Sequence, residues 1–133
     1  MPSPSLDVPS ITILLTAFRE ASTIGSALRP LVEQAHRYEH EIIVICPDDE
    51  TAAAAQAAHP AALLLRDPAR GKPAALNLGL NQARGEVVVM TDGDVFIGEG
   101  ALDALLAPFV NGCVGAVSGR PISRESRATL FGF

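Results

Sequence analysis

The sequence contains no tryptophan, one tyrosine and, among its ten basic residues, a single lysine, Lys72. So few aromatic rings argue against a stacking platform for nucleic acid or carbohydrate. The formal net charge of -5 leaves no basic surface for nucleic acid either. We therefore expect no nucleic-acid partner. An anionic ligand would have to be held by a few local groups, by a helix N-terminus or by a metal ion.

Long apolar runs are also missing, because none reaches the roughly 18 residues of a membrane span. Residues 1–9 are rich in proline and serine and lack the basic and then apolar pattern of a signal peptide. We expect them to form a flexible tail on a soluble, cytoplasmic chain. The two cysteines, Cys46 and Cys113, have no partner at metal-ligand spacing, which predicts buried free thiols. With 48% hydrophobic residues, residues 10–133 can form one globular domain.

Apolar, β-branched runs alternate with segments of helical spacing along most of the chain. The expected strands are residues 11–15, 41–46, 61–65, 87–90 and 113–119, and the expected helices are residues 23–35, 51–58, 73–84 and 101–109. Pro30 predicts a kink or break in the first helix. This order predicts an α/β, Rossmann-like fold with a mostly parallel sheet and helices on both faces. Residues 120–133 close on no helix or turn signal, so we expect the fold to be truncated at the C-terminus.

The most informative stretch is residues 86–94, which read E-V-V-V-M-T-D-G-D. Four large apolar residues without polar alternation suit a strand covered on both faces of a parallel sheet. Asp92 and Asp94 follow at its carboxyl end, where such sheets place their ligands. Two carboxylates this close repel each other unless a cation lies between them. The pattern therefore favours a hard divalent cation bound to a phosphate.

Four segments resemble motifs of the family 2 inverting nucleotide-sugar glycosyltransferases. Residues 13–20 resemble that family's opening strand with its P-T-Y-N-E loop, and residues 41–49 resemble its second strand with an acidic loop. Residues 71–80, G-K-P-A-A-L-N-L-G-L, are similar to its G-K-x-x-A-L-N-x-G helix, and residues 91–94 to its D-x-D motif. The resemblance covers about residues 10–120. It implies the nucleotide-binding, N-terminal part of a GT-A fold.

The resemblance also implies an activity. Such an enzyme transfers a sugar from a nucleoside-diphosphate sugar, with a UDP-sugar favoured here, to an acceptor hydroxyl with inversion. Mg²⁺ or Mn²⁺ stabilises the charge on the diphosphate leaving group. The resemblance assigns the ion to Asp94 and Asp92, with Asp92 and Gly93 also lying against the nucleotide.

The remaining nucleotide contacts that the resemblance implies come from the ends of the other strands. Asp48, with Asp49 as its substitute, would accept hydrogen bonds from the base. Thr16 and Ala17 would border the pocket, and Glu20 would reach the ribose. Lys72, at an electropositive helix N-terminus, would lie beside the base or the diphosphate.

The sequence departs from the family pattern in two places. Cys46 and Pro47 stand where two aspartates usually follow the second strand. The family's catalytic base and its Q-x-x-R-W-type motif have no match before Phe133, and Glu125 lies in a charged, solvated segment. No catalytic residue is identified. The alternative is therefore a truncated donor-binding half-domain without transfer activity. For an active enzyme, the acceptor stays open between a saccharide, a lipid and a protein. Contact with a membrane would come only through a missing C-terminal part.

Competing families fit the motifs less well. A haloacid-dehalogenase-type phosphatase carries its D-x-D on the first strand, with threonine or valine at the position of Phe96. Sugar nucleotidyltransferases and NAD-binding domains have a glycine-rich loop after the first strand, and residues 16–20 contain no glycine.

Overall fold

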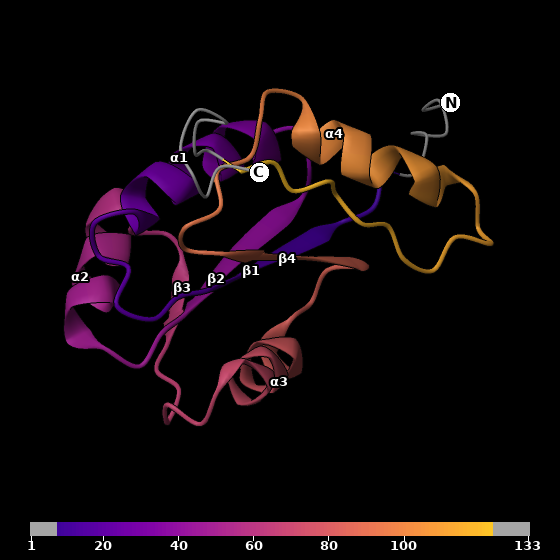
Figure 1. Cartoon of the computed structure of the whole chain (residues 1–133). Helices are drawn as coiled ribbons and strands as arrows, with labels where there is room; N and C mark the ends of the chain where they lie inside the picture. Colours follow the sequence, from indigo (N-terminus) through magenta and orange to yellow (C-terminus); the bar gives the residue numbers. More distant parts are fainter. Residues whose placement is uncertain (1–7, 124–133) are drawn as a thin grey trace. The chain divides into compact units, whose positions relative to one another are not determined.

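The computed structural model describes residues 8–123 of the chain. Contacts divide the chain into two compact units, Met1–Leu102 and Asp103–Phe133. The first unit holds a four-stranded sheet with the order β3-β2-β1-β4 (Figure 1). All neighbouring strands are parallel, and the strands are β1 (Ile11–Thr16), β2 (His40–Ile45), β3 (Leu63–Leu65) and β4 (Val87–Asp92). The predicted α/β, Rossmann-like fold is confirmed.

Helices cover both faces of this sheet (Figure 1). On one face lie α1 (Ile24–Ala35) and α2 (Asp49–Ala58), and on the other lies α3 (Lys72–Gln82). All six residues of β1 are buried, as a strand between two helical layers requires. Helix α1 buries an apolar stripe at helical spacing, made of Ile24, Ala27, Leu28, Leu31 and Ala35. It continues through Pro30, so the expected break is not formed, and the alternative of a kink stays a prediction.

Helix α3 lies close to the sheet because its contact face is small. Ala75 packs with Leu14, Ile43 and Ile45 in one buried cluster. A Cβ atom on Gly79 would lie 3.1 Å from a methyl group of Leu14 and would collide with Ile45. Glycine at this position therefore allows the close approach that brings the N-terminus of α3 to the end of the sheet.

Strand β4 differs from the sequence prediction in its burial. We expected it to be covered on both faces, yet its residues are only partly buried, and Met90 is 55% exposed. Within residues 8–123, β1 is the neighbour with which β4 pairs, so β4 lies at an edge of the described sheet. An apolar run can predict a strand, but it cannot tell how many layers cover that strand.

The described part of the second unit, with the helix that begins at the end of the first unit, contains little regular structure. Helix α4 (Ala101–Leu106) ends earlier than predicted and passes into a 3₁₀ helix, η1 (Ala107–Val110). Pro108 lacks the N–H that a continuing α-helix needs. The strand predicted over residues 113–119 is not formed, since this segment is mostly exposed and pairs with no strand in the described part of the chain. Its glycines weaken strand formation, and Cys113 is exposed rather than buried as predicted.

No helix in the described range 8–123 is both long and apolar enough to cross a membrane.

Candidate functional site

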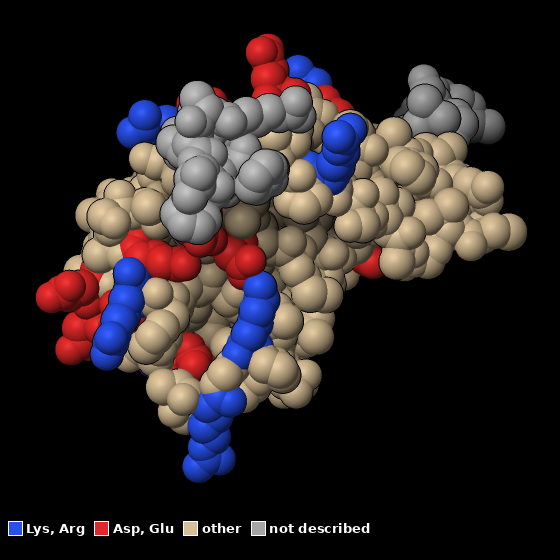
Figure 2. Space-filling view, viewed as in Figure 1, with Lys and Arg blue, Asp and Glu red and all other residues tan. Residues whose placement is uncertain are grey.

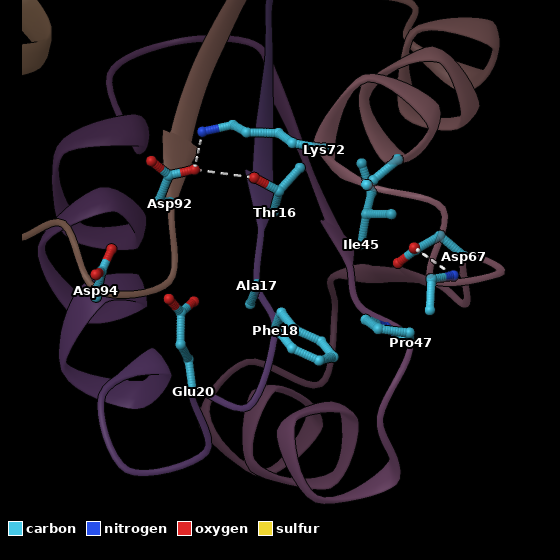
Figure 3. A pocket seen from close by; sticks show the side chains of 13 residues that line it. Thr16, Ala17, Phe18, Glu20, Ile45, Pro47, Asp67, Lys72, Asp92 and Asp94 are labelled. Carbon is cyan, nitrogen blue, oxygen red and sulfur yellow. Dashed lines mark hydrogen bonds and ion pairs between the residues drawn. The ribbon is translucent and has the colours of Figure 1, made fainter.

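A cavity of about 480 Å³ opens at the carboxyl ends of the parallel strands (Figure 3). Parallel α/β sheets place their ligands at this edge because the loops that follow the strands meet there. Figure 2 shows acidic and basic side chains gathered around a hollow between α2 and α3. The cavity is lined by Thr16, Ala17, Phe18, Glu20, Ile45, Pro47, Asp67, Ala69, Gly71, Lys72, Ala75, Asp92 and Asp94.

The loop after β4 that carries Asp92 and Asp94 is fixed by hydrogen bonds at Gly93. The N–H of Gly93 donates to Thr16 O at 2.9 Å, and its carbonyl accepts from the Thr23 hydroxyl at 2.8 Å. A Cβ atom here would lie 2.8 Å from Ala17 Cβ and would collide with the Glu20 carboxylate. A residue without a side chain therefore lets the two aspartates reach the cavity.

Asp92 is held by two partners on one of its oxygens. Its Oδ1 accepts from the Thr16 hydroxyl at 3.0 Å and forms an ion pair with the ammonium group of Lys72. Lys72 is the first residue of α3, preceded by Gly71 with a φ of 96°, a conformation that other residues rarely adopt. Helix α3 therefore brings a cation and its electropositive N-terminus to the cavity.

Glu20 and Asp94 complete an acidic side of the cavity opposite Asp67 (Figure 3). The Glu20 Oε2 atom is buried and has no hydrogen-bond partner among the described residues. Burial raises the pKa of Glu20, and the negative charges of Asp94 and Asp92 raise it further. A buried carboxylate oxygen without a donor is costly, so it marks a place where polar groups of a ligand are favourable. Asp94 is exposed and accepts no hydrogen bond from the described part of the chain.

The residues present suit a metal ion that arrives with a phosphate. Among residues 8–123, no three carboxylate, histidine or cysteine side chains converge to hold an ion by themselves. Mg²⁺ is commonly bound by one or two carboxylates together with substrate phosphates. Asp94 and the open oxygen of Asp92 match that donor set. The pKa of Glu20 is raised first by burial and then by the negative charges of Asp94 and Asp92, which a cation here would offset.

The structure places Asp48 and Asp49 elsewhere. Asp48 caps α2, because its carboxylate accepts from the Thr51 N–H, the Thr51 hydroxyl and the Arg19 N–H. Burial alone would raise the pKa of Asp48, but these hydrogen bonds outweigh it and hold the pKa below its ordinary value. Asp49 is paired with Arg66 at 2.6 Å. Both aspartates border a second cavity, which also includes Arg19.

Seven of the nine predicted site residues are therefore brought together: Thr16, Ala17, Glu20, Lys72, Asp92, Gly93 and Asp94. Sequence analysis missed two cavity residues of chemical interest, Phe18 and Asp67. Phe18 is 56% exposed and presents an aromatic face. Asp67 follows a strand, as the other aspartates do, and that signal could have identified it.

Comparison with known proteins agrees with this arrangement. Residues 12–131 match glycosyl transferase family 2. A search of curated proteins found no match. Among solved structures, a mannosyltransferase from Pyrobaculum calidifontis, in complex with GDP-Man and Mn²⁺, is 35% identical with a TM-score of 0.60, covering 66% of this chain and 28% of that one.

Two further structures share the fold. Glucosyl-3-phosphoglycerate synthase from Mycobacterium tuberculosis, in complex with Mn²⁺, UDP and phosphoglyceric acid, is 24% identical with a TM-score of 0.67, over 80% of this chain and 41% of that one. Mannosyl-3-phosphoglycerate synthase from Rubrobacter xylanophilus is 23% identical with a TM-score of 0.65, over 77% and 36%. This chain thus spans less than half the length of each of the three. The match over residues 12–131 shows that the chain belongs to glycosyl transferase family 2, and the expected GT-A fold is confirmed.

Proposed function

We propose that the cavity at the end of the sheet binds the nucleoside-diphosphate part of a sugar donor together with a divalent cation. The observation that carries this proposal is the acidic side of the cavity. Among the described residues, neither Asp94 nor the buried Glu20 Oε2 atom has a hydrogen-bond donor. Structural neighbours support it, since one was solved with GDP-Man and Mn²⁺ and another with UDP and Mn²⁺.

Each side chain has a role that follows from its contacts. Asp94, exposed and unpaired within the described residues, ligates the ion directly. Asp92 is held in one orientation by Thr16 and Lys72 and offers its second oxygen to the ion or its waters. Bound Mg²⁺ or Mn²⁺ would neutralise the charge that develops on the diphosphate as the glycosidic bond breaks. Lys72 and the N-terminus of α3 add positive potential on the same side.

The nucleoside occupies the rest of the cavity. Glu20 Oε2 accepts a hydrogen bond from a ribose hydroxyl, which gives this buried oxygen the donor that it lacks. Phe18 offers an exposed ring for the base to stack on. The neighbours with bound nucleotide carry either GDP or UDP, so they leave the identity of the base open.

Transfer itself proceeds in this proposal by direct displacement with inversion, in which a general base deprotonates the acceptor hydroxyl. The described residues include no carboxylate or histidine that we assign to this step. A donor-binding half-domain without transfer activity is therefore the second candidate.

Isothermal titration calorimetry with UDP-, GDP- and dTDP-sugars in Mn²⁺ tests the proposal. We expect binding that EDTA abolishes and that Asp94→Ala weakens at least tenfold, on the order of the loss that follows removal of a metal-site contact. Glu99→Ala is the matched control, because it removes the same charge from an exposed residue outside the cavity. Binding that does not depend on metal, or that Asp94→Ala leaves intact, would refute the donor site. Donor binding without transfer or hydrolysis would favour the half-domain.

A further inference from the structure

Asp67 is a buried carboxylate that the roles assigned so far leave unused. It follows β3 and is 9% exposed. Figure 3 shows it across the cavity from Asp92 and Asp94, on the side of Pro47 and Phe18. A nucleoside diphosphate whose phosphates lie at Asp92 and Asp94 therefore directs its base toward Asp67.

The hydrogen bonds of Asp67 leave it able to accept more. Its Oδ2 accepts from the Ala69 N–H at 3.1 Å, which fixes the orientation of the carboxylate. Its Oδ1 has no donor among the described residues. The adjacent cation, Arg66, is engaged elsewhere, since it donates to the Pro47 carbonyl at 2.8 Å and to Asp49 at 2.6 Å. Unlike Glu20 Oε2, the Asp67 Oδ1 atom is not sealed from solvent, so it is open to the cavity, where a ligand can supply the missing donors.

The nucleobases differ in what they offer such a carboxylate. Guanine presents two donors side by side on one edge, N1–H and the N2 amino group. Uracil presents a single N–H between two carbonyl oxygens, which would face the carboxylate oxygens and repel them. Adenine places an acceptor, N1, next to its amino group. A carboxylate with open acceptor positions therefore complements guanine best, because both of these neighbouring donors then face an acceptor oxygen.

We propose that Asp67 selects guanine, so that the donor is a guanosine-diphosphate sugar. This inference rests on the proposed function and replaces the UDP-sugar that the sequence favoured. Phe18 would stack on the base without discriminating among bases, because every base has an aromatic face. Specificity then resides in the hydrogen bonds to Asp67.

Calorimetric titration of the whole chain in Mn²⁺ tests this inference. The ligands are the diphosphates of guanosine (GDP), inosine (IDP), uridine (UDP) and xanthosine (XDP). We expect GDP to bind about 10- to 100-fold more tightly than UDP, which corresponds to one bidentate base contact. IDP, which lacks the N2 amino group, should lie between them. Asp67→Asn should weaken GDP binding by a similar factor and strengthen XDP binding, because an amide N–H donates to the carbonyl at C2 of xanthine. A purely structural role for Asp67 would not produce that gain.

Glu99→Gln is the matched control, because it makes the same kind of change in an exposed carboxylate outside the cavity, and it should change none of these affinities. Equal affinity for GDP and UDP, or unchanged GDP binding in Asp67→Asn, would overturn the inference and leave the donor site standing. Failure of the unaltered chain to bind any of these nucleotides with Mn²⁺ would overturn the proposed function itself. If circular dichroism shows Asp67→Asn to be unfolded, the order of GDP, IDP and UDP on the unaltered chain decides alone.

Discussion

Gly93 allows the stability of the chain and the geometry of its site to be tested with one methyl group. A Cβ atom at this position would lie 2.8 Å from Ala17 Cβ and closer than 3.0 Å to Glu20 Oε2. Ala17 is 7% exposed and continues from β1, so it has little room to move. The Gly93 backbone is also held on both sides, by Thr16 O and by the Thr23 hydroxyl. Gly93→Ala therefore has to displace the loop itself.

Overpacking of this kind costs about 1–3 kcal/mol of unfolding free energy. For a chain of this size that lowers the melting temperature by roughly 4 °C per kcal/mol. The displaced loop carries Asp92 and Asp94, and a shift of about 1 Å in positioned groups can cost on the order of 100-fold in function. We expect Mn²⁺-dependent nucleotide affinity to fall by at least tenfold, together with the loss of stability.

Urea denaturation followed by circular dichroism gives the stability change, and calorimetric titration gives the affinity. Gly98→Ala is the matched control, because its Cβ would meet nothing within 4 Å and its backbone is not in the left-handed region. That variant should keep the stability and the affinity of the unaltered chain. A Gly93→Ala variant with the same denaturation midpoint and the same affinity would refute the packing that places the aspartates.

Two further predictions concern titratable groups outside the cavity. Asp48→Ala should lower the free energy of unfolding by about 1 kcal/mol at pH 7, because the α2 cap is lost. The folded-state pKa of Asp48 lies below its ordinary value of 3.8. The stabilisation by the Asp48 carboxylate is therefore present above pH 3.8 and is lost as the pH falls through the folded-state pKa. Denaturation of both proteins at pH 7 and pH 3 measures this difference in stability. Asp48→Asn should retain most of the cap without the pH dependence. An equal loss of stability for Asp48→Ala at both pH values would contradict the role of the Asp48 carboxylate as the cap. Burial raises the pKa of the Cys46 thiol to about 11, whereas Cys113 is exposed. A thiol reagent at pH 8 should therefore modify Cys113 quickly and Cys46 only after unfolding. Rapid modification of Cys46 in the native chain, identified by peptide mass spectrometry, would show that the residue directly after β2 is not buried.

The parts of the fold that the sequence predicts well are those with two-sided burial. β1 and β2 read as continuous apolar runs because α1, α2 and α3 cover both faces, and their positions were predicted to within one residue at each end. The predictions failed where local composition competes with long-range pairing. The segment 113–119 is rich in valine and glycine, but it forms no strand in the described structure. Strand formation needs a partner edge, which periodicity cannot supply.

The residues of the candidate site that lie close together in the sequence were the ones predicted best. Asp92, Gly93 and Asp94 follow one strand, so their meeting at the cavity required no knowledge of the other elements. Asp48 also follows a strand, yet it precedes an alanine-rich helix and has Thr51 three residues later. Those features are equally typical of an N-cap, and the structure shows that capping prevails.

The supply of hydrogen-bond donors explains why aspartates at equivalent places in the fold differ in what they can do. Asp48 receives three hydrogen bonds from neighbouring residues, so the protein already satisfies its carboxylate. Asp92 receives two, both on Oδ1, and Asp67 receives one, on Oδ2. Asp94 receives none from the described residues. The number of acceptor positions left open therefore increases from Asp48 to Asp94. A ligand can form the most hydrogen bonds with the carboxylate that receives the fewest from the protein. Counting donors at each strand-end carboxylate therefore defines the proposed nucleotide site more sharply than the spacing of the aspartates in the sequence does.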